Sequence, residues 1–201
     1  MLTVRSESGA AACCWFVDPR EAKATLEATR EANPDVEGLH LGVTPLGVAF
    51  GACGGWVGGD DAASTDSGLE GTNGFDGELR LVGTHAVVSK MAPQLQEQLK
   101  SQGIEPACWS LPVFCCDELQ SAAVMPMFMS HEDLAHAWVL SGRKRKELPE
   151  QITVMDLRLL AHQMQTTDNF AWSTVQILCS KTAIELVEEA KAQAQALVGI
   201  L

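Results

Sequence analysis

The chain contains no tyrosine, and aromatic residues make up only 5% of its 201 residues. Positive charge is also scarce, because 14 Lys and Arg stand against 26 Asp and Glu, for a formal net charge of −12. Proteins that bind nucleic acids or anionic membranes need clustered Lys and Arg to meet the phosphates. The charge balance therefore argues against both kinds of partner.

No segment is predicted to cross a membrane, although residues 42–59 carry no charge. Pro45 and repeated glycines interrupt this run, whereas a spanning helix needs about 20 mostly large apolar residues. The N-terminus carries neither a signal peptide nor a basic, Ser-rich transit segment, so we expect a mature form whose leader is not shown. With 46% hydrophobic residues, the chain can bury a sizeable core as one domain or two small lobes.

The seven cysteines are an odd number without regular spacing, which predicts reduced thiols rather than a disulfide framework. Two adjacent pairs, Cys13-Cys14 and Cys115-Cys116, fall on predicted strands, where neighbouring side chains point to opposite faces. We expect one buried and one exposed thiol in each pair, with oxidation sensing as the alternative.

The sequence contains no recognisable catalytic or metal-binding pattern. His131 and His136 are spaced i, i+5 around Glu132, whereas two histidines that bind a metal from one helical face are spaced i, i+4. No glycine loop of the phosphate-binding kind is present, and no Ser/His/Asp or Cys/His set stands out. We therefore predict a protein without catalysis, metal or cofactor.

One local pattern occurs twice: a short apolar strand that runs directly into a capped helix. In residues 125–138, Phe128 ends the strand, and Ser130 with Asp133 fits a capping box. In residues 13–26, Phe16 occupies the position of Phe128 and Asp18 that of Ser130. The repetition of this device points to an internal duplication.

The rest of the chain continues the duplication. We predict a mixed α/β fold of two repeated halves with pseudo-twofold symmetry, residues 1–105 and 106–201, which form one compact unit. Each half reads hairpin, helix, strand, helix, strand, helix. The predicted elements are 1–17, 18–32, 39–43, 44–53, 78–89 and 90–102 in the first half, and 111–129, 130–141, 151–155, 156–165, 171–179 and 180–197 in the second.

Two segments are candidates for contacts with a partner. Residues 54–77, rich in Gly, Asp and Ser, form a predicted loop insertion of the first half, with Trp56 and Phe75 as its large aromatic residues. The second segment is the basic run Arg143, Lys144, Arg145 and Lys146, which is either a solvated loop or a docking contact for an acidic partner or a lipid headgroup.

Five runs of the sequence together resemble the Tic-twenty-two family, soluble components of the chloroplast protein-import machinery. They are 112–114 (PVF), 127–134 (MFMSHEDL) and 152–157 (ITVMDL), with first-half echoes at 16–22 (FVDPREA) and 42–47 (GVTPLG). The resemblance implies an α/β fold of two repeated halves with apolar grooves, and a chaperone-like role without catalysis or cofactor.

Two functions follow as alternatives, and both are non-catalytic. The first is a chaperone-like component of plastid protein import that binds client polypeptides. The second is an accessory subunit of a larger plastid assembly, such as a photosynthetic membrane complex. In both cases we expect a plastid location, in the intermembrane space or stroma, and a peripheral rather than transmembrane association with any membrane.

Overall fold

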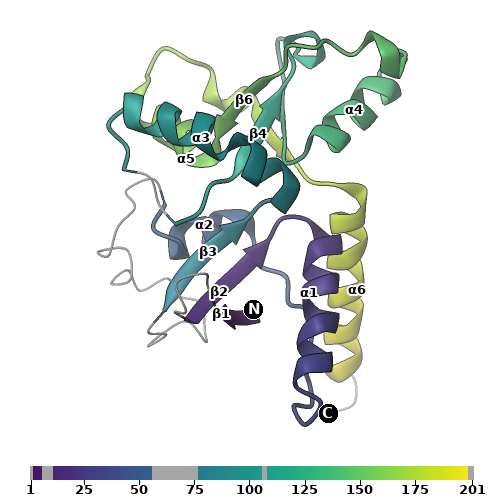
Figure 1. Cartoon of the computed structure of the whole chain (residues 1–201). Helices are drawn as coiled ribbons and strands as arrows, with labels where there is room; N and C mark the ends of the chain where they lie inside the picture. The colour runs from purple at the N-terminus through teal and green to yellow at the C-terminus, as the bar shows by residue number, and fades with distance from the viewer. Residues whose placement is uncertain (1, 6–10, 56–76, 106–107, 199–201) are drawn as a thin grey trace.

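The structure, a computed structural model, describes residues 2–5, 11–55, 77–105 and 108–198, and it contains two β-sheets (Figure 1). In the first sheet, β2 (Ala11–Phe16) lies between β1 (Leu2–Arg5) and β3 (Glu78–Val82). The second sheet has the order β6-β4-β5-β7, with β4 (Pro112–Cys115), β5 (Met125–Phe128), β6 (Thr153–Asp156) and β7 (Val175–Leu178).

The described residues also form six α-helices, which confirms the predicted mixed α/β fold. They are α1 (Pro19–Ala32), α2 (Leu46–Ala52), α3 (His85–Ser101), α4 (His131–Leu140), α5 (Leu157–Thr166) and α6 (Lys181–Val198). Figure 1 shows α3 and α5 beside the second sheet and α4 on its other flank. Helix α6 follows β7 of the second sheet and runs alongside α1.

The two sheets share one pairing pattern. β1 and β4 are antiparallel to the strand that follows them in sequence, and β3 and β7 are parallel to that same strand. Phe16 ends β2 opposite Val82, and Phe128 ends β5 opposite Leu178. The two phenylalanines therefore occupy the same kind of element, whereas the superposition of the halves and their boundary at residue 105 stay predictions.

One predicted strand of the first half is wrong, and a second, at 78–89, is confirmed only in its first part, β3. Residues 39–43 form no strand, because Gly38 has a left-handed backbone (φ +78°) and the segment joins no sheet edge. Residues 85–89, predicted as the end of a strand, are the first turns of α3. Val87 and Met91, four residues apart, pack against the same buried cluster, which is a helical spacing rather than the alternation of a strand.

The predicted starts of α1 and α4 are confirmed. The Asp18 carboxylate accepts the Arg20 N–H at 2.9 Å, and the Ser130 hydroxyl oxygen accepts the Asp133 N–H at 3.1 Å. The Asp133 carboxylate, however, accepts the Ser130 hydroxyl and not the backbone N–H that a capping box predicts. The hydroxyl therefore serves as donor and acceptor within the same cap.

The prediction of one exposed thiol in each cysteine pair is wrong. Cys13 and Cys14 are 0% and 7% exposed, and Cys115 and Cys116 are 3% and 2% exposed. β2 and β4 are inner strands of their sheets and are covered on both faces. Side chains on either face of these strands are therefore buried. Burial raises the pKa of all four thiols, that of Cys13 to about 11.

A buried junction joins segments from both predicted halves. Asp156 caps α5 by accepting the Arg158 N–H at 2.8 Å, and its second oxygen accepts the Leu111 N–H at 3.2 Å. Arg158 donates from Nε to the Gly55 carbonyl at 3.3 Å and lies over the Trp109 ring, 5.8 Å from its centroid. Trp109 in turn donates from Nε1 to the Cys53 carbonyl at 3.3 Å. One hydrophobic cluster surrounds these contacts, with Ala49 and Leu81 on one side and Met127 and Leu160 on the other.

The burial of Asp156 predicts a pH-dependent stability. Burial raises the pKa of this carboxyl to about 6, against 3.8 for the free group. The folded state therefore holds the proton more tightly than the unfolded state, so this contribution is present below pH 3.8 and is lost as the pH rises through 6. Relative to Asp156→Asn, the wild type should lose about 3 kcal/mol of unfolding free energy between pH 3.5 and 7. Urea denaturation at both pH values measures the difference.

The control for this experiment is Asp168→Asn, which changes an exposed carboxylate. It should leave the pH dependence of the wild type unchanged. A pH dependence of Asp156→Asn equal to that of the wild type would show that Asp156 is ionised as readily in the folded protein as in the unfolded chain.

The capped strand–helix device predicts a graded series of stabilities. Phe128 is 3% exposed, and its removal in Phe128→Ala should cost about 3–5 kcal/mol through a core cavity. Ser130→Ala removes the acceptor for one helix N–H and should cost about 1 kcal/mol. Leu140→Ala, at a position that is 74% exposed, should change stability by less than about 0.5 kcal/mol. If Phe128→Ala did not have the lowest denaturant midpoint of the three, Phe128 would not be the anchor of this element.

Candidate functional site

An apolar groove of about 740 Å³ lies between the first sheet and α6. Its floor consists of the ends of β2 and β3 with the start of α1, and the segment 40–47 forms one wall. Helix α6 and the end of β7 form the opposite wall. The side chains that line it are almost all apolar, among them Trp15, Phe16, Leu81, Met129, Ile177, Ile184 and Val187.

Local hydrogen bonds hold the wall made by residues 40–47. The Trp15 indole donates from Nε1 to the Thr44 hydroxyl at 3.3 Å, which ties this segment to β2. The Arg30 guanidinium donates to the Leu39 carbonyl, and the His40 ring meets the Gly38 carbonyl at 2.8 Å. The segment is therefore fixed at both ends although it belongs to no sheet, and Val43 remains 45% exposed on it.

The opposite wall is one face of α6. This helix begins after Ser180, whose hydroxyl oxygen accepts the Ala183 N–H at 3.1 Å. Ala183, Ile184 and Val187 follow at helical spacing and line the groove. Ile184 is 47% exposed, so this wall presents apolar surface to solvent and not a closed core.

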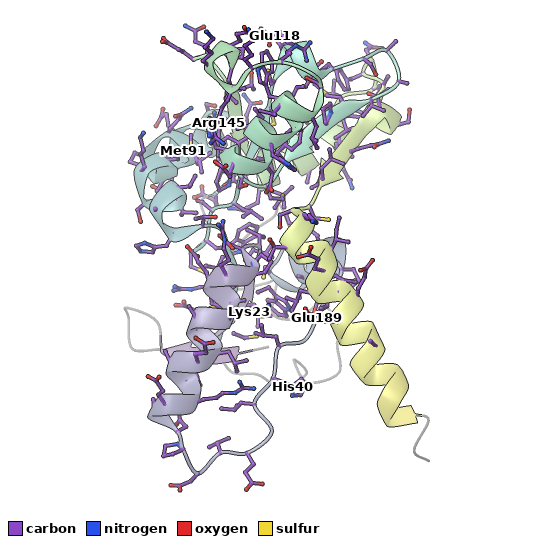
Figure 2. The ribbon with its side chains drawn as sticks, turned by 90° about the vertical axis from the view of Figure 1, so that its right-hand side faces the viewer. Lys23, His40, Met91, Glu118, Arg145 and Glu189 are labelled. Atoms are coloured by element: carbon purple, nitrogen blue, oxygen red, sulfur yellow. The ribbon has the colours of Figure 1, made fainter. Side chains whose placement is uncertain are left out.

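A second hollow of about 290 Å³ adjoins the groove between α1 and α6 and shares His40, Leu41 and Leu186 with it. Its remaining lining is largely charged, with Lys23, Glu27, Arg30 and Glu189. Figure 2 shows Lys23 on α1, Glu189 on α6 and His40 around this hollow. The apolar groove thus opens into a charged rim.

Few of the side chains that line the groove carry a chemically reactive group. Cys14, Cys179, His40 and Glu188 contribute to the lining, and burial raises the pKa of the Cys14 thiol, which keeps it protonated. Among the residues that the structure describes, no hydrogen bond joins these four side chains, and no group of three or more potential metal ligands occurs. The described lining can hold apolar side chains, but it presents no nucleophile–base pair.

Of the residues predicted to contact a partner, those that the structure describes are not part of the groove lining. Trp56 and Phe75 fall outside the described residues. Arg145 forms a two-pronged ion pair with Glu132, with nitrogen–oxygen distances of 3.0 and 2.7 Å. Arg143 lies over the Trp138 ring at 4.6 Å and donates to the Glu118 carbonyl at 2.9 Å.

The other two basic residues belong to the same turn. Lys144 donates its N–H to the Glu147 carboxylate at 3.2 Å and accepts the Trp138 indole N–H on its carbonyl at 3.0 Å. Lys146 is exposed. Figure 2 shows Arg145 with Glu118 and Met91 in the upper part of the molecule, far from the hollow beside Lys23.

The sequence pattern alone missed the residues of the groove. Ile184 and Val187 fit the apolar stripe of an ordinary core helix, and Val43 was placed on a strand. Apolar grooves were expected only from the family resemblance. Their location depends on the packing of α6 beside α1, a contact between distant parts of the chain.

Comparison with known proteins defines the fold. No family model matches the sequence, and no curated protein matches it. Among solved structures, Tic22 from Plasmodium falciparum is similar, with a TM-score of 0.56 and 16% identity over 96% of this chain and 88% of that chain. Tic22 from Anabaena, a protein of the protein-transport class, is similar with a TM-score of 0.52 and 16% identity over 94% of this chain and 86% of that one.

The chain therefore has a Tic22-like fold, as the resemblance at sequence level predicted. At this identity the likeness is one of fold. Within the described part of the chain, no helix combines the length and apolar character needed to cross a membrane.

The groove predicts binding of an apolar dye. Anilinonaphthalene sulfonate should fluoresce on binding to the wild type, because a groove of about 740 Å³ accommodates its rings. Ile184→Asp places a carboxylate on one wall and should weaken dye binding about tenfold, because burying an unpaired charge is costly. Leu140→Asp, the same change on an exposed face of α4, is the control and should bind dye as the wild type does. Equal dye binding by all three proteins would contradict this site.

Proposed function

We propose that the chain is a non-catalytic, chaperone-like component of plastid protein import, and that it binds client polypeptides in the apolar groove. The observation that carries the proposal is the groove itself, with walls of Val43 and Ile184 that remain 45% and 47% exposed. Large exposed apolar surfaces on a protein commonly mark a site of interaction with another macromolecule.

The lining favours a polypeptide over a small metabolite. Metabolite sites combine apolar walls with a few convergent polar groups that orient the ligand. In the described lining, the Thr44 hydroxyl accepts a hydrogen bond from the Trp15 indole, and the His40 ring lies at hydrogen-bond distance from the Gly38 carbonyl. Both polar groups therefore already have a partner within the chain. Met129 supplies a flexible side chain, which adapts to clients of different shape.

The fold supports the biological setting of the proposal. Both solved neighbours are Tic22 proteins, and the one from Anabaena is classed under protein transport. We propose the same setting for this chain, with a plastid location in the intermembrane space or stroma and at most a peripheral association with membranes.

The groove favours client binding over the accessory-subunit alternative. That alternative depended on the insertion at 54–77 and on the basic run at 143–146. Arg143, Lys144 and Arg145 contact neighbouring groups of the second half. Ion pairs as exposed as that of Arg145 with Glu132 are weak and exchange readily with a partner, so these residues remain candidates for a secondary contact.

A client-aggregation assay tests the proposal. The wild type at a severalfold molar excess should suppress the aggregation of a thermally unfolded model protein, measured by light scattering. Ile184→Asp should lose most of this suppression, because a charged wall disfavours apolar segments. Leu140→Asp should retain it, since that position lies outside the groove lining. Suppression that is absent from the wild type, or equal in both variants, would refute client binding in the groove.

A further inference from the structure

β7 is an edge strand of the second sheet, and its own residues carry none of the usual edge protection. It pairs only with β5 among the described strands, at the end of the order β6-β4-β5-β7. Ile177 and Leu178 are 39% and 37% exposed on it, and its four residues, VQIL, include no charge and no proline. Native proteins usually block an exposed edge with charges, proline, a bulge or a covering element, because unpaired strand groups attract another chain.

The opposite edge of the same sheet shows such protection. β6 lies at that edge, and α3 packs against it. The Gln98 side chain donates from Nε2 to the Val154 carbonyl of β6 at 2.9 Å, so it occupies one of the acceptors that a further strand would use. Within the described residues, the second sheet therefore has a helix packed against its β6 edge, whereas β7 pairs with β5 alone.

The free edge is continuous with the groove. Successive strand residues face opposite sides, so Val175 and Ile177 share one face. Val175 packs against the large hydrophobic cluster, and Ile177 lines the groove together with Cys179. A strand added to β7 would place every second side chain on this same face, at the mouth of the groove.

From this geometry we propose that a client segment docks in extended conformation as an additional strand on the free edge of β7, with alternate apolar side chains directed into the groove. This inference deepens the proposed function and depends on it. The segment that fits alternates apolar and polar residues and is neutral or basic. A second copy of this chain fits less well, because two molecules of net charge −12 repel each other.

Backbone-modified peptides test the docking mode separately from client binding. The probe is a ten-residue peptide of alternating Val and Thr with a terminal Lys, together with two versions that are N-methylated at alternate residues. Each version blocks the amide donors of one peptide edge and keeps every side chain. With the full chain, one version should bind at least about tenfold more weakly than the parent, and the other should match the parent.

Equal affinity of all three peptides would overturn strand addition and leave groove binding intact. If the parent peptide and the unfolded client both fail to bind, the proposed function itself fails. The two failures are therefore distinguishable.

A charge on the edge provides a second, independent test. Leu178→Lys protects the edge, and Leu178 is outside the groove lining, so dye binding should remain at the wild-type level. Affinity for the parent peptide should fall about tenfold. The matched control Leu140→Lys, at a position 74% exposed on α4, should leave it unchanged. Unchanged peptide affinity in Leu178→Lys, or a concentration-dependent dimer of the wild type that this variant abolishes, would overturn the proposal.

Discussion

The buried pair Asp156 and Arg158 is the interaction that the rest of the arrangement depends on. Both side chains are 0% exposed, and together they contact three separate segments: the stretch around Leu111, the end of α2 near Gly55, and the start of α5. Burying charged groups is costly unless each finds partners. Here the Asp156 carboxylate accepts the N–H groups of Leu111 and Arg158, and the Arg158 guanidinium donates to the Gly55 carbonyl, so the two side chains link all three segments.

The placement of α6 beside α1 forms one wall of the groove. The chain leaves β7 in the second sheet and continues as α6 along the flank of α1 (Figure 1). Helix α6 then covers α1 without filling the space over the ends of β2 and β3. The groove is therefore a gap between parts of the chain that are distant in sequence, with β7 as the edge that leads into it.

Local signals made much of the fold predictable. Asp18 and Ser130 stop a strand and start a helix within a few residues, so their caps were found from sequence spacing. Residues 85–89 were predicted as a strand because Val87 and Val88 have a high strand propensity. Val87 packs against the cluster around Phe128, and this contact is too distant in sequence to be read from the local pattern. The sequence did not predict the groove either. Ile184 fits the pattern of a core residue, and only the position of α6 shows that it is exposed.

The most direct measurement of the central claim is hydrogen–deuterium exchange of the full chain with and without an unfolded client. The account predicts slower exchange in three segments that surround the groove, which are residues 40–47, β7 and the first turns of α6. Exchange in α4 should stay unchanged, because that helix lies outside the groove lining. Protection centred on α4 and the basic run at 143–146, with none around the groove, would contradict the account.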